Sequence, residues 1–221
     1  MMGSPRVHHR LTDSTNERAR ALAASGAPHG TLVTADEQTA GRGRQGREWT
    51  APPRSAVLMS LVLRELEDVL PLAAAVAVCE ALAPLECAIK WPNDVWLSGQ
   101  KIAGILAEGR PAEGWAVLGI GLNVSSHPPD LPATSLRAHG DDRSVEDVLP
   151  ALVPELDRWL HSPAASVLDA WRSRDALLGQ TVRWQEGSGE AAGIDASGAL
   201  LVDTESGRVA LNAGEVHLGP S

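Results

Sequence analysis

The sequence contains no phenylalanine and no tyrosine, so seven tryptophans supply all of its aromatic side chains. Cysteine is also scarce. Cys79 and Cys87 are the only two, and neither a CxxC pair nor a histidine cluster with metal-ligand spacing accompanies them. Neither a disulfide framework nor a structural zinc site is therefore indicated. We expect both cysteines to be buried thiols, and the tryptophans other than Trp49 to lie in the core.

The sequence also lacks a hydrophobic run long enough to cross a membrane. Its most apolar segment, VLPLAAAVAVC at residues 69–79, is too short and is followed by Glu80. The N-terminal MMGSPRVHH has no apolar region of the kind that signal peptides contain. A chain of 221 residues can bury a substantial core in one large domain, or in a large and a small one. We expect a cytoplasmic globular protein with no membrane partner.

Lysine is nearly absent as well. Of the 19 basic residues, 17 are arginine and two are lysine, Lys90 and Lys101. Arginine fills positions where a positive charge is sufficient, so the two lysines indicate sites that need a compact ammonium group with an adjustable pKa. The alternative is that both are chance survivors on the surface. The formal net charge of −9 does not favour binding to nucleic acid.

The stretch GRGRQG at residues 41–46 fits the G-x-G-x-x-G pattern of a dinucleotide-binding turn. Its context does not, because polar residues separate it from the preceding strand and Pro52-Pro53 disfavours a following helix. A P-loop would need Lys and Ser or Thr where Arg47 and Glu48 stand. What remains is a glycine-rich loop with three arginines in an acidic protein. Such a loop indicates binding of a small anion, with a solvated basic loop as the alternative.

The apolar pattern predicts an α+β fold with a β-rich tail. A helix is predicted after Ser14, which has capping-box spacing to Glu17. Further helices are predicted at residues 69–83, 144–160 and 164–178, and strands at residues 31–35, 56–63, 88–91, 94–97, 101–108 and 115–124. After Gly179, short β-like pieces alternate with turn residues, as in a small barrel. We therefore expect one domain at residues 1–176 and a second at residues 177–221.

Ser98-Gly99 is a two-residue hairpin signal between two of these strands. If Leu97 and Gln100 flank the turn, Lys101 lies opposite Trp96 and Ala103 opposite Asp94. Alternation along the strands then places Asp94, Trp96 and Lys101 on one face. A structural ion pair between Asp94 and Lys101 is the plainest interpretation of that arrangement.

Several longer motifs occur in a specific order and spacing. They are DSTN (residues 13–16), GRGRQGREW (41–49), KWPND (90–94), KIAGIL (101–106), GIGLN (119–123), ATSL (133–136) and NAGEV (212–216). With them the sequence resembles the biotin protein ligases from about residue 10 to its C-terminus. The resemblance implies a catalytic domain like that of class II aminoacyl-tRNA synthetases, with a mixed, largely antiparallel sheet, followed by an SH3-like barrel. DSTN begins at residue 13, so we expect the short type without an N-terminal DNA-binding domain.

The activity that this resemblance implies has two steps. Biotin and MgATP give biotinyl-5′-adenylate and pyrophosphate, and the biotinyl group then passes to one lysine of the biotin carboxyl carrier domain of a carboxylase. Nucleic acid and membrane are not expected partners, and a homodimer is left open. A lipoate protein ligase of the same superfamily is an alternative, but it lacks the arginine loop and KWPND. A non-catalytic biotin sensor is another, but both lysines are present.

The resemblance also implies the site residues. Lys101, Arg42 and Lys90 are expected to be catalytic, with Lys101 bridging the biotin carboxyl and the α-phosphate. Those expected at biotin are Ser14, Thr15, Asn16, Gln38, Gly41, Arg42, Gly43, Arg44, Lys101 and Gly104. Those expected at ATP or the adenylate are Arg44, Arg47, Trp49, Asn93 and Asn123. Uncharged donors and acceptors suit the ureido ring of biotin, and arginine forks suit phosphates. Asp94 is a candidate Mg²⁺ ligand, and the ion pair with Lys101 is its alternative role.

Overall fold

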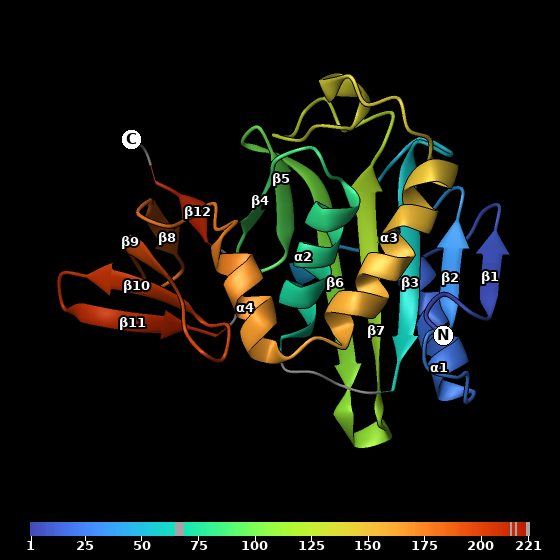
Figure 1. Cartoon of the computed structure of the whole chain (residues 1–221), viewed down its shortest axis with the longest axis horizontal. Helices are drawn as coiled ribbons and strands as arrows, with labels where there is room; N and C mark the ends of the chain where they lie inside the picture. The colour runs from blue at the N-terminus through green and yellow to red at the C-terminus, as the bar shows by residue number, and fades with distance from the viewer. Residues whose placement is uncertain (65–68, 213, 215, 220–221) are drawn as a thin grey trace.

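The computed structural model describes residues 1–64, 69–212, 214 and 216–219. Ala213 and Glu215 of the NAGEV motif, and the last two residues of the predicted β tail, lie outside this part. Two β-sheets and four α-helices make up the described residues (Figure 1). No helix among these residues is both long and apolar enough to cross a membrane.

The larger sheet has seven strands in the order β1-β2-β3-β7-β6-β5-β4. Their bounds are β1 Arg6–His9, β2 Leu32–Ala35, β3 Ala56–Leu63, β4 Cys87–Lys90, β5 Asp94–Leu97, β6 Gln100–Arg110 and β7 Trp115–Asn123. β1 and β2 pair in parallel, and every other neighbouring pair is antiparallel. The sheet is therefore mixed and largely antiparallel, as the family resemblance implies. β1 was not expected from the sequence, because RVHH has no apolar run to mark a strand.

Helices cover both faces of this sheet. α1 (Thr15–Ala24) packs against β2, β3 and β7. Figure 1 shows α2 (Leu70–Ala81), α3 (Val145–Leu160) and α4 (Ala164–Arg172) together in front of the sheet. α3 runs through Pro150 and Pro154, both of which lie on its exposed side. α4 ends six residues before the predicted limit at Leu178.

β3 explains how the two faces differ, because its eight residues are all buried. Val57, Met59, Leu61 and Leu63 belong to the main core beneath α2 and α3. The alternate residues lie on the other face, where Val62 and the buried Ser60 contact α1 and where Ala56 and Leu58 pack beside Trp49. One strand thus completes the core on one side and supports the polar N-terminus of α1 on the other.

The second sheet is antiparallel, with the strand order β11-β10-β9-β8-β12. Its strands are β8 Thr181–Trp184, β9 Gly187–Ile194, β10 Leu200–Thr204, β11 Gly207–Leu211 and β12 His217–Leu218. Its inward residues, such as Val182, Leu200 and Val202, are part of the main core. The indole nitrogen of Trp91, in the KWPND motif, donates to the carbonyl of Gly198 at 3.0 Å. The C-terminal sheet is therefore packed on the first unit rather than tethered to it.

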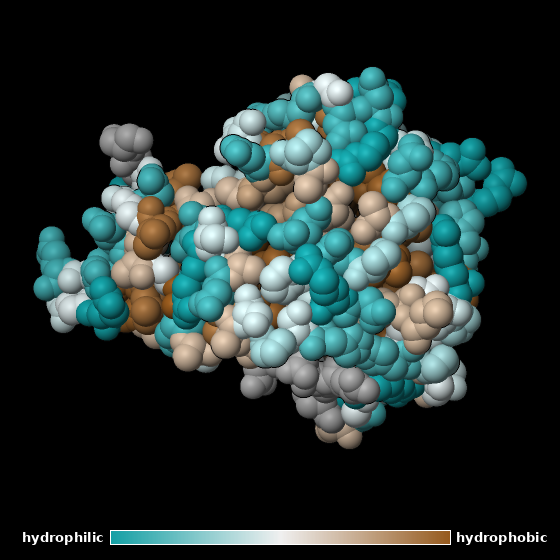
Figure 2. Space-filling view, viewed as in Figure 1, coloured by the Kyte–Doolittle hydropathy of each residue, from teal (hydrophilic) through white to brown (hydrophobic). Residues whose placement is uncertain are grey.

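Most of the face in view is polar (Figure 2). The hydrophobic residues visible there lie in small separate groups between hydrophilic ones. Both cysteines are buried, as predicted. Four tryptophans, Trp91, Trp115, Trp159 and Trp171, are buried in the core. The core prediction is wrong for Trp96, which is half-buried beside the cavity described below.

Two local predictions are wrong. Ser14 is the N-cap of α1, but its side chain makes no capping bond, and the Ser14 N–H, which Glu17 would accept from in a capping box, donates instead to the carboxylate of Asp13 at 2.6 Å. The capping box with Glu17 is therefore absent. Lys101 pairs with Trp96 as expected, but a β-bulge follows, so Gly104 rather than Ala103 lies opposite Asp94.

Candidate functional site

A cavity of about 620 Å³ opens on the α1 side of the seven-stranded sheet. It is lined by the start of α1, the arginine loop (residues 41–49), strands β3 to β7 and β12. Nearly all of the predicted site residues line it, namely Ser14, Thr15, Asn16, Gln38, Arg42, Gly43, Arg44, Arg47, Trp49, Lys90, Asn93, Asp94, Lys101, Gly104 and Asn123. Segments from Ser14 to Leu218, about two hundred residues apart in the sequence, thus meet around one space.

Gly41 is not among the lining residues of this cavity but lines the neighbouring one. A Cβ on Gly41 would lie 2.3 Å from the carbonyl oxygen of Trp49. The Trp49 N–H also donates to the Gly41 carbonyl at 2.9 Å. The missing side chain therefore allows the two ends of the arginine loop to close on each other.

One part of the cavity is polar and uncharged. The Oε1 of Gln38 accepts from both the backbone N–H and the hydroxyl of Thr15, at 2.7 and 3.0 Å. The Ser60 hydroxyl lies 2.8 Å from the Thr15 hydroxyl and 2.6 Å from Asn16 Oδ1. Because its side chain is not used for capping, the Ser14 hydroxyl is also available here. These are fixed donors and acceptors without net charge, as a neutral polar ring requires.

Lys101 lies further along the cavity, on β6. Its Nζ is 2.7 Å from Asp94 Oδ1 and 5.7 Å from the centre of a Trp49 ring. The β-bulge places Gly104 on the same face, where an added Cβ would lie 3.1 Å from Lys101 Nζ and 3.0 Å from Trp49. The bulge and the glycine together make room for the Lys101 ammonium above the sheet.

Lys90 reaches the cavity from the end of β4. Its Nζ is 5.5 Å from the centre of the Trp96 ring. Burial lowers the pKa of Lys90 below the ordinary lysine value, and the nearby Lys101 and Arg47 lower it further, while Asp94 opposes them. Both lysines of the chain therefore lie in one cavity.

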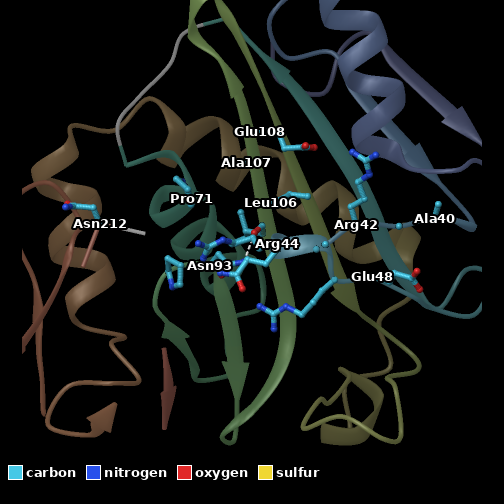
Figure 3. Close-up of a pocket in the computed structure, with 17 residues that line it drawn as sticks. Ala40, Arg42, Arg44, Glu48, Pro71, Asn93, Leu106, Ala107, Glu108 and Asn212 are labelled. Atoms are coloured by element: carbon cyan, nitrogen blue, oxygen red, sulfur yellow. Dashed lines mark hydrogen bonds between the residues drawn. The ribbon is translucent and has the colours of Figure 1, made fainter. Parts of the chain in front are cut away.

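The arginine loop is a narrow hairpin with a short 3₁₀ turn (Arg44–Gly46) at its tip, and no helix follows it. Its residues also line a neighbouring cavity of about 780 Å³, which shares Arg42, Arg44 and Arg47 with the first. Figure 3 shows Arg44 directed at Asn93 in this region, and the bond to Asn93 Oδ1 is 3.1 Å long. Arg44 also donates to the carbonyl of Gly214 in the C-terminal unit at 3.0 Å. Burial lowers the pKa of Arg44 from the ordinary arginine value.

The glycines of GIGLN are site features that the sequence analysis missed. On β7, Gly119, Gly121 and Asn123 share the face that forms the cavity floor. A Cβ on Gly119 would lie 2.1 Å from Asn16 Oδ1, and one on Gly121 would lie 2.3 Å from Trp49 Cε2. The signal was an alternation of glycines in a buried strand, which marks a close approach by other groups.

Asn123 ends this row. Its Nδ2 donates to the carbonyl of Thr134 at 2.9 Å, and its buried Oδ1 has no hydrogen-bond partner among the described residues. The indole nitrogen of Trp49 is likewise buried and unpartnered within that part of the chain. Both residues line the cavity, where a bound molecule with complementary groups would be close to these atoms.

Acidic residues are few at this site. Within the described residues no group of three His, Cys, Asp or Glu side chains has the arrangement of a metal site. Asp94 is paired with Lys101, and the amide of Asn93 is occupied by Arg44 and by the carbonyl of Ile105. An all-protein metal cage is therefore not formed by these residues.

Comparison with known proteins gives a consistent result. Residues 8–125 match the Biotin/lipoate A/B protein ligase family, and residues 177–219 match the Biotin protein ligase C terminal domain. The bifunctional ligase/repressor BirA of Bacillus subtilis is 35% identical over 99% of this chain and 75% of its own length. The biotin--[acetyl-CoA-carboxylase] ligase of Mycobacterium tuberculosis is 38% identical over 94% of this chain and 86% of its own.

Solved structures agree. A biotin protein ligase from Aquifex aeolicus in complex with biotin and ATP superposes with a TM-score of 0.85, at 29% identity over 99% of this chain and 100% of that one. A biotin protein ligase from Leishmania major in complex with biotinyl-5-AMP gives a TM-score of 0.69, at 25% identity over 95% and 99%.

Proposed function

This chain belongs to the biotin protein ligase family and is an ATP-dependent biotin ligase, and from that premise we propose how its cavity carries out the reaction. The observation that carries the proposal is the order of groups along the floor. The uncharged Ser14, Thr15 and Gln38 stand at one end, beside Asn16, and Lys101 with Trp49 and Asn123 stands at the other.

The length of β7 between Gly119 and Asn123 gives the length of the cavity floor. Gly119 lies under Asn16, Gly121 under Trp49, and Asn123 follows. At about 3.3 Å per residue the row covers roughly 13 Å. We place the ureido ring of biotin at the Asn16 end and the nucleotide at the Trp49 and Asn123 end. The carboxylate of biotin then meets the α-phosphate between them, near Lys101.

The first step joins two anions. A carboxylate oxygen of biotin attacks the α-phosphorus, the bond from that phosphorus to the bridging oxygen breaks, and pyrophosphate leaves. Lys101 is positioned to neutralise the carboxylate and the α-phosphate together, since its ammonium stands above Gly104 without blocking the floor. Arg42, Arg44 and Lys90 add positive charge around this point, and the arginine loop excludes water from the adenylate.

Mg²⁺ in this reaction neutralises the charge of the triphosphate. Asp94 and Asn93 are the nearest oxygen-bearing candidates from KWPND, but the structure already pairs both. These two residues would therefore supply at most one or two ligands to Mg²⁺. The phosphates and water would supply the other ligands, as is usual for this ion.

The second step transfers biotin to a carrier domain. We propose that the acceptor is one lysine of a biotin carboxyl carrier domain of a carboxylase, whose amine attacks the mixed anhydride and releases AMP. We also propose that residues 177–221 are an SH3-like unit with its boundary near Leu177, following a catalytic unit like that of class II aminoacyl-tRNA synthetases. Val216, His217 and Leu218 of this unit line the cavity, which favours a role beside the adenylate or the carrier.

Exchange of radioactive pyrophosphate into ATP tests the first step. We expect exchange that requires both biotin and Mg²⁺, because pyrophosphate is re-formed into ATP only when the adenylate is made. Lipoate in place of biotin is expected to give no exchange, and exchange with lipoate alone would identify a lipoate ligase. If the folded protein binds biotin but shows no exchange, it is a biotin sensor instead.

Two glycine variants test the order of groups along β7. Gly119→Ala is expected to displace Asn16 and to raise the KM for biotin more than the KM for ATP, by about tenfold, since a misplaced hydrogen bond costs about 1 to 2 kcal/mol. Gly121→Ala is expected to displace Trp49 and to raise the KM for ATP more. The two variants control for each other, because they add the same methyl group to the same face of one strand. Equal effects of both variants on both KM values would contradict the layout.

A further inference from the structure

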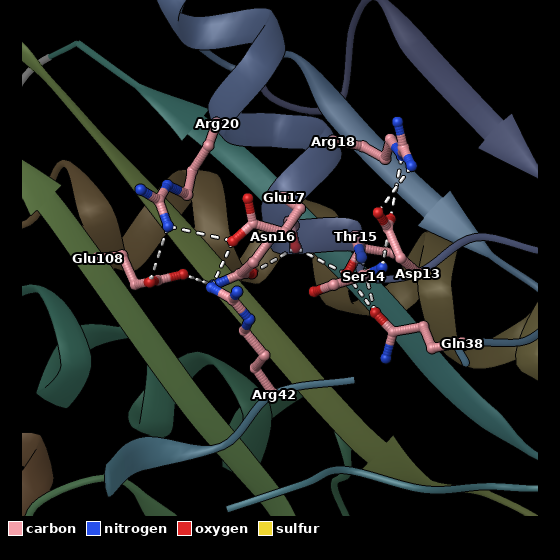
Figure 4. Close-up of polar contacts among 11 residues, drawn as sticks. Asp13, Ser14, Thr15, Asn16, Glu17, Arg18, Arg20, Gln38, Arg42 and Glu108 are labelled. Atoms are coloured by element: carbon pink, nitrogen blue, oxygen red, sulfur yellow. Dashed lines mark hydrogen bonds and ion pairs between the residues drawn. The ribbon is translucent and has the colours of Figure 1, made fainter. Parts of the chain in front are cut away.

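Four charged side chains form a row beside the uncharged end of the cavity (Figure 4). Arg42, from the arginine loop, is paired with Glu17 of α1. Glu17 is also 3.1 Å from Arg20 Nη1, and Arg20 Nη1 is 3.5 Å from Glu108 of β6. Charges therefore alternate along Arg42, Glu17, Arg20 and Glu108, and Arg42 is the end member.

Glu17 can join this row because it is free of the helix cap. Asp13 occupies the Ser14 N–H that a capping box would give to Glu17. Figure 4 shows Glu17 on the opposite side of the α1 start from Asp13 and directed toward Arg42 and Arg20. Its side chain is about one third exposed, at 34%, so it can exchange partners without being buried unpaired.

Arg42 lines both cavities, yet its charge is taken by Glu17. An anionic ligand that uses Arg42 must therefore compete with the Glu17 carboxylate. Separating Arg42 from Glu17 costs little free energy, because Arg20 stays beside Glu17 and remains its partner. Glu108 in turn keeps its bond from Asn16 Nδ2, at 2.8 Å.

We propose that Glu17 is a positioning residue: it pairs with Arg42 when no ligand is bound, and the strength of that pair sets the affinity of the site for the carboxylate of biotin. Arg20 is the second partner of Glu17, and it lowers the free-energy cost of releasing Arg42. The inference rests on the proposed function, in which Arg42 meets the acid end of biotin. It assigns Glu17 no contact with the ligand itself.

Two substitutions are expected to act in opposite directions on the Kd for biotin, measured by calorimetry. Glu17→Gln removes the competing charge, so biotin should bind about two- to fivefold more tightly, the range of an exposed ion pair. Arg20→Gln leaves Glu17 with Arg42 as its remaining partner in the row, so biotin should bind more weakly by a similar factor. A general loss of structure would weaken binding in both.

Three controls separate this role from a simple change in net charge. Glu190→Gln, on the exposed part of β9, removes the same charge and should leave the Kd unchanged. In an Arg42→Ala background, Glu17→Gln should no longer tighten binding. Biotinol, in which an alcohol replaces the carboxylate, should bind the wild type and Glu17→Gln equally.

The outcomes distinguish the two proposals. Wild-type protein that fails to bind biotin overturns the proposed function, and this inference with it. Wild-type protein that binds biotin and supports exchange, combined with an unchanged or weaker Kd in Glu17→Gln, overturns the role of Glu17 alone. A tighter Kd that persists in the Arg42→Ala background also overturns it, because Glu17 would then act without Arg42.

Discussion

Replacing Lys101 with alanine is expected to lower the rate of biotin-dependent ATP/pyrophosphate exchange by about a hundredfold to a thousandfold. That is the usual loss when one preorganised group is removed from a developing negative charge. The backbone of Lys101 is fixed by the segment at residues 132–134, because the Lys101 backbone N–H donates to the carbonyl of Pro132 at 3.0 Å and the Lys101 carbonyl accepts from the backbone N–H of Thr134 at 2.8 Å. The backbone should therefore keep its place when the side chain is lost.

The control concerns Asp94, which Lys101→Ala leaves without its ammonium partner at 2.7 Å. An unpaired carboxylate would itself repel phosphate. The double variant Lys101→Ala, Asp94→Asn removes that repulsion. We expect it to stay within about tenfold of Lys101→Ala, since the missing group is the ammonium. Exchange restored to the wild-type rate in the double variant, or retained in Lys101→Ala, would contradict the role of Lys101.

The sequence predicts the main elements well where apolar residues follow a simple period. β3 coincides with the predicted strand at residues 56–63, and α2 lies within the predicted helix at residues 69–83. Both are buried almost throughout, so burial and local pattern agree. The sequence does not predict β1, because this strand is stabilised by its parallel pairing with β2. That pairing is a tertiary contact, and RVHH shows no alternation of apolar and polar residues that would indicate it.

The site residues were predicted from motifs, and their arrangement was not. The bulge after Lys101 shows the reason. Strict alternation places Lys101 and Ala103 on one face, whereas the extra residue brings Gly104 there instead. A bulge depends on how two strands pair, so the sequence of one strand does not reveal it.

The start of α1 is a second case. Ser14 and Glu17 have the spacing of a capping box, but Asp13 competes for the same N–H and takes it. The two possible acceptors lie on opposite sides of Ser14 in the sequence, Asp13 one residue before it and Glu17 three residues after it. Glu17 is consequently directed to Arg42, and this contact between distant segments could not be read from the DSTN motif.

Replacing Arg44 with alanine is expected to give the second large effect, a loss of roughly a hundredfold in exchange. The Arg44 guanidinium joins three segments, since it donates to Asn93 Oδ1 of KWPND at 3.1 Å and to the carbonyl of Gly214 at 3.0 Å. Arg44 is half-buried, so its charge is less hydrated than that of an ordinary surface arginine and interacts more strongly with phosphate; the same burial lowers its pKa.

Loss of Arg44 should also weaken the closure of the arginine loop over the adenylate. Biotin-dependent release of AMP without an acceptor should therefore rise relative to exchange, because water reaches the adenylate. Arg54→Ala is the matched control, since Arg54 is an exposed arginine paired with Asp36 at 3.0 Å and lines neither cavity. Arg44→Lys should recover part of the exchange, because it restores the positive charge. It should recover little of the retention of the adenylate, because an ammonium lacks the guanidinium fork that reaches both Asn93 and the Gly214 carbonyl. Equal behaviour of Arg44→Ala and Arg54→Ala would mean that the loop closes without Arg44.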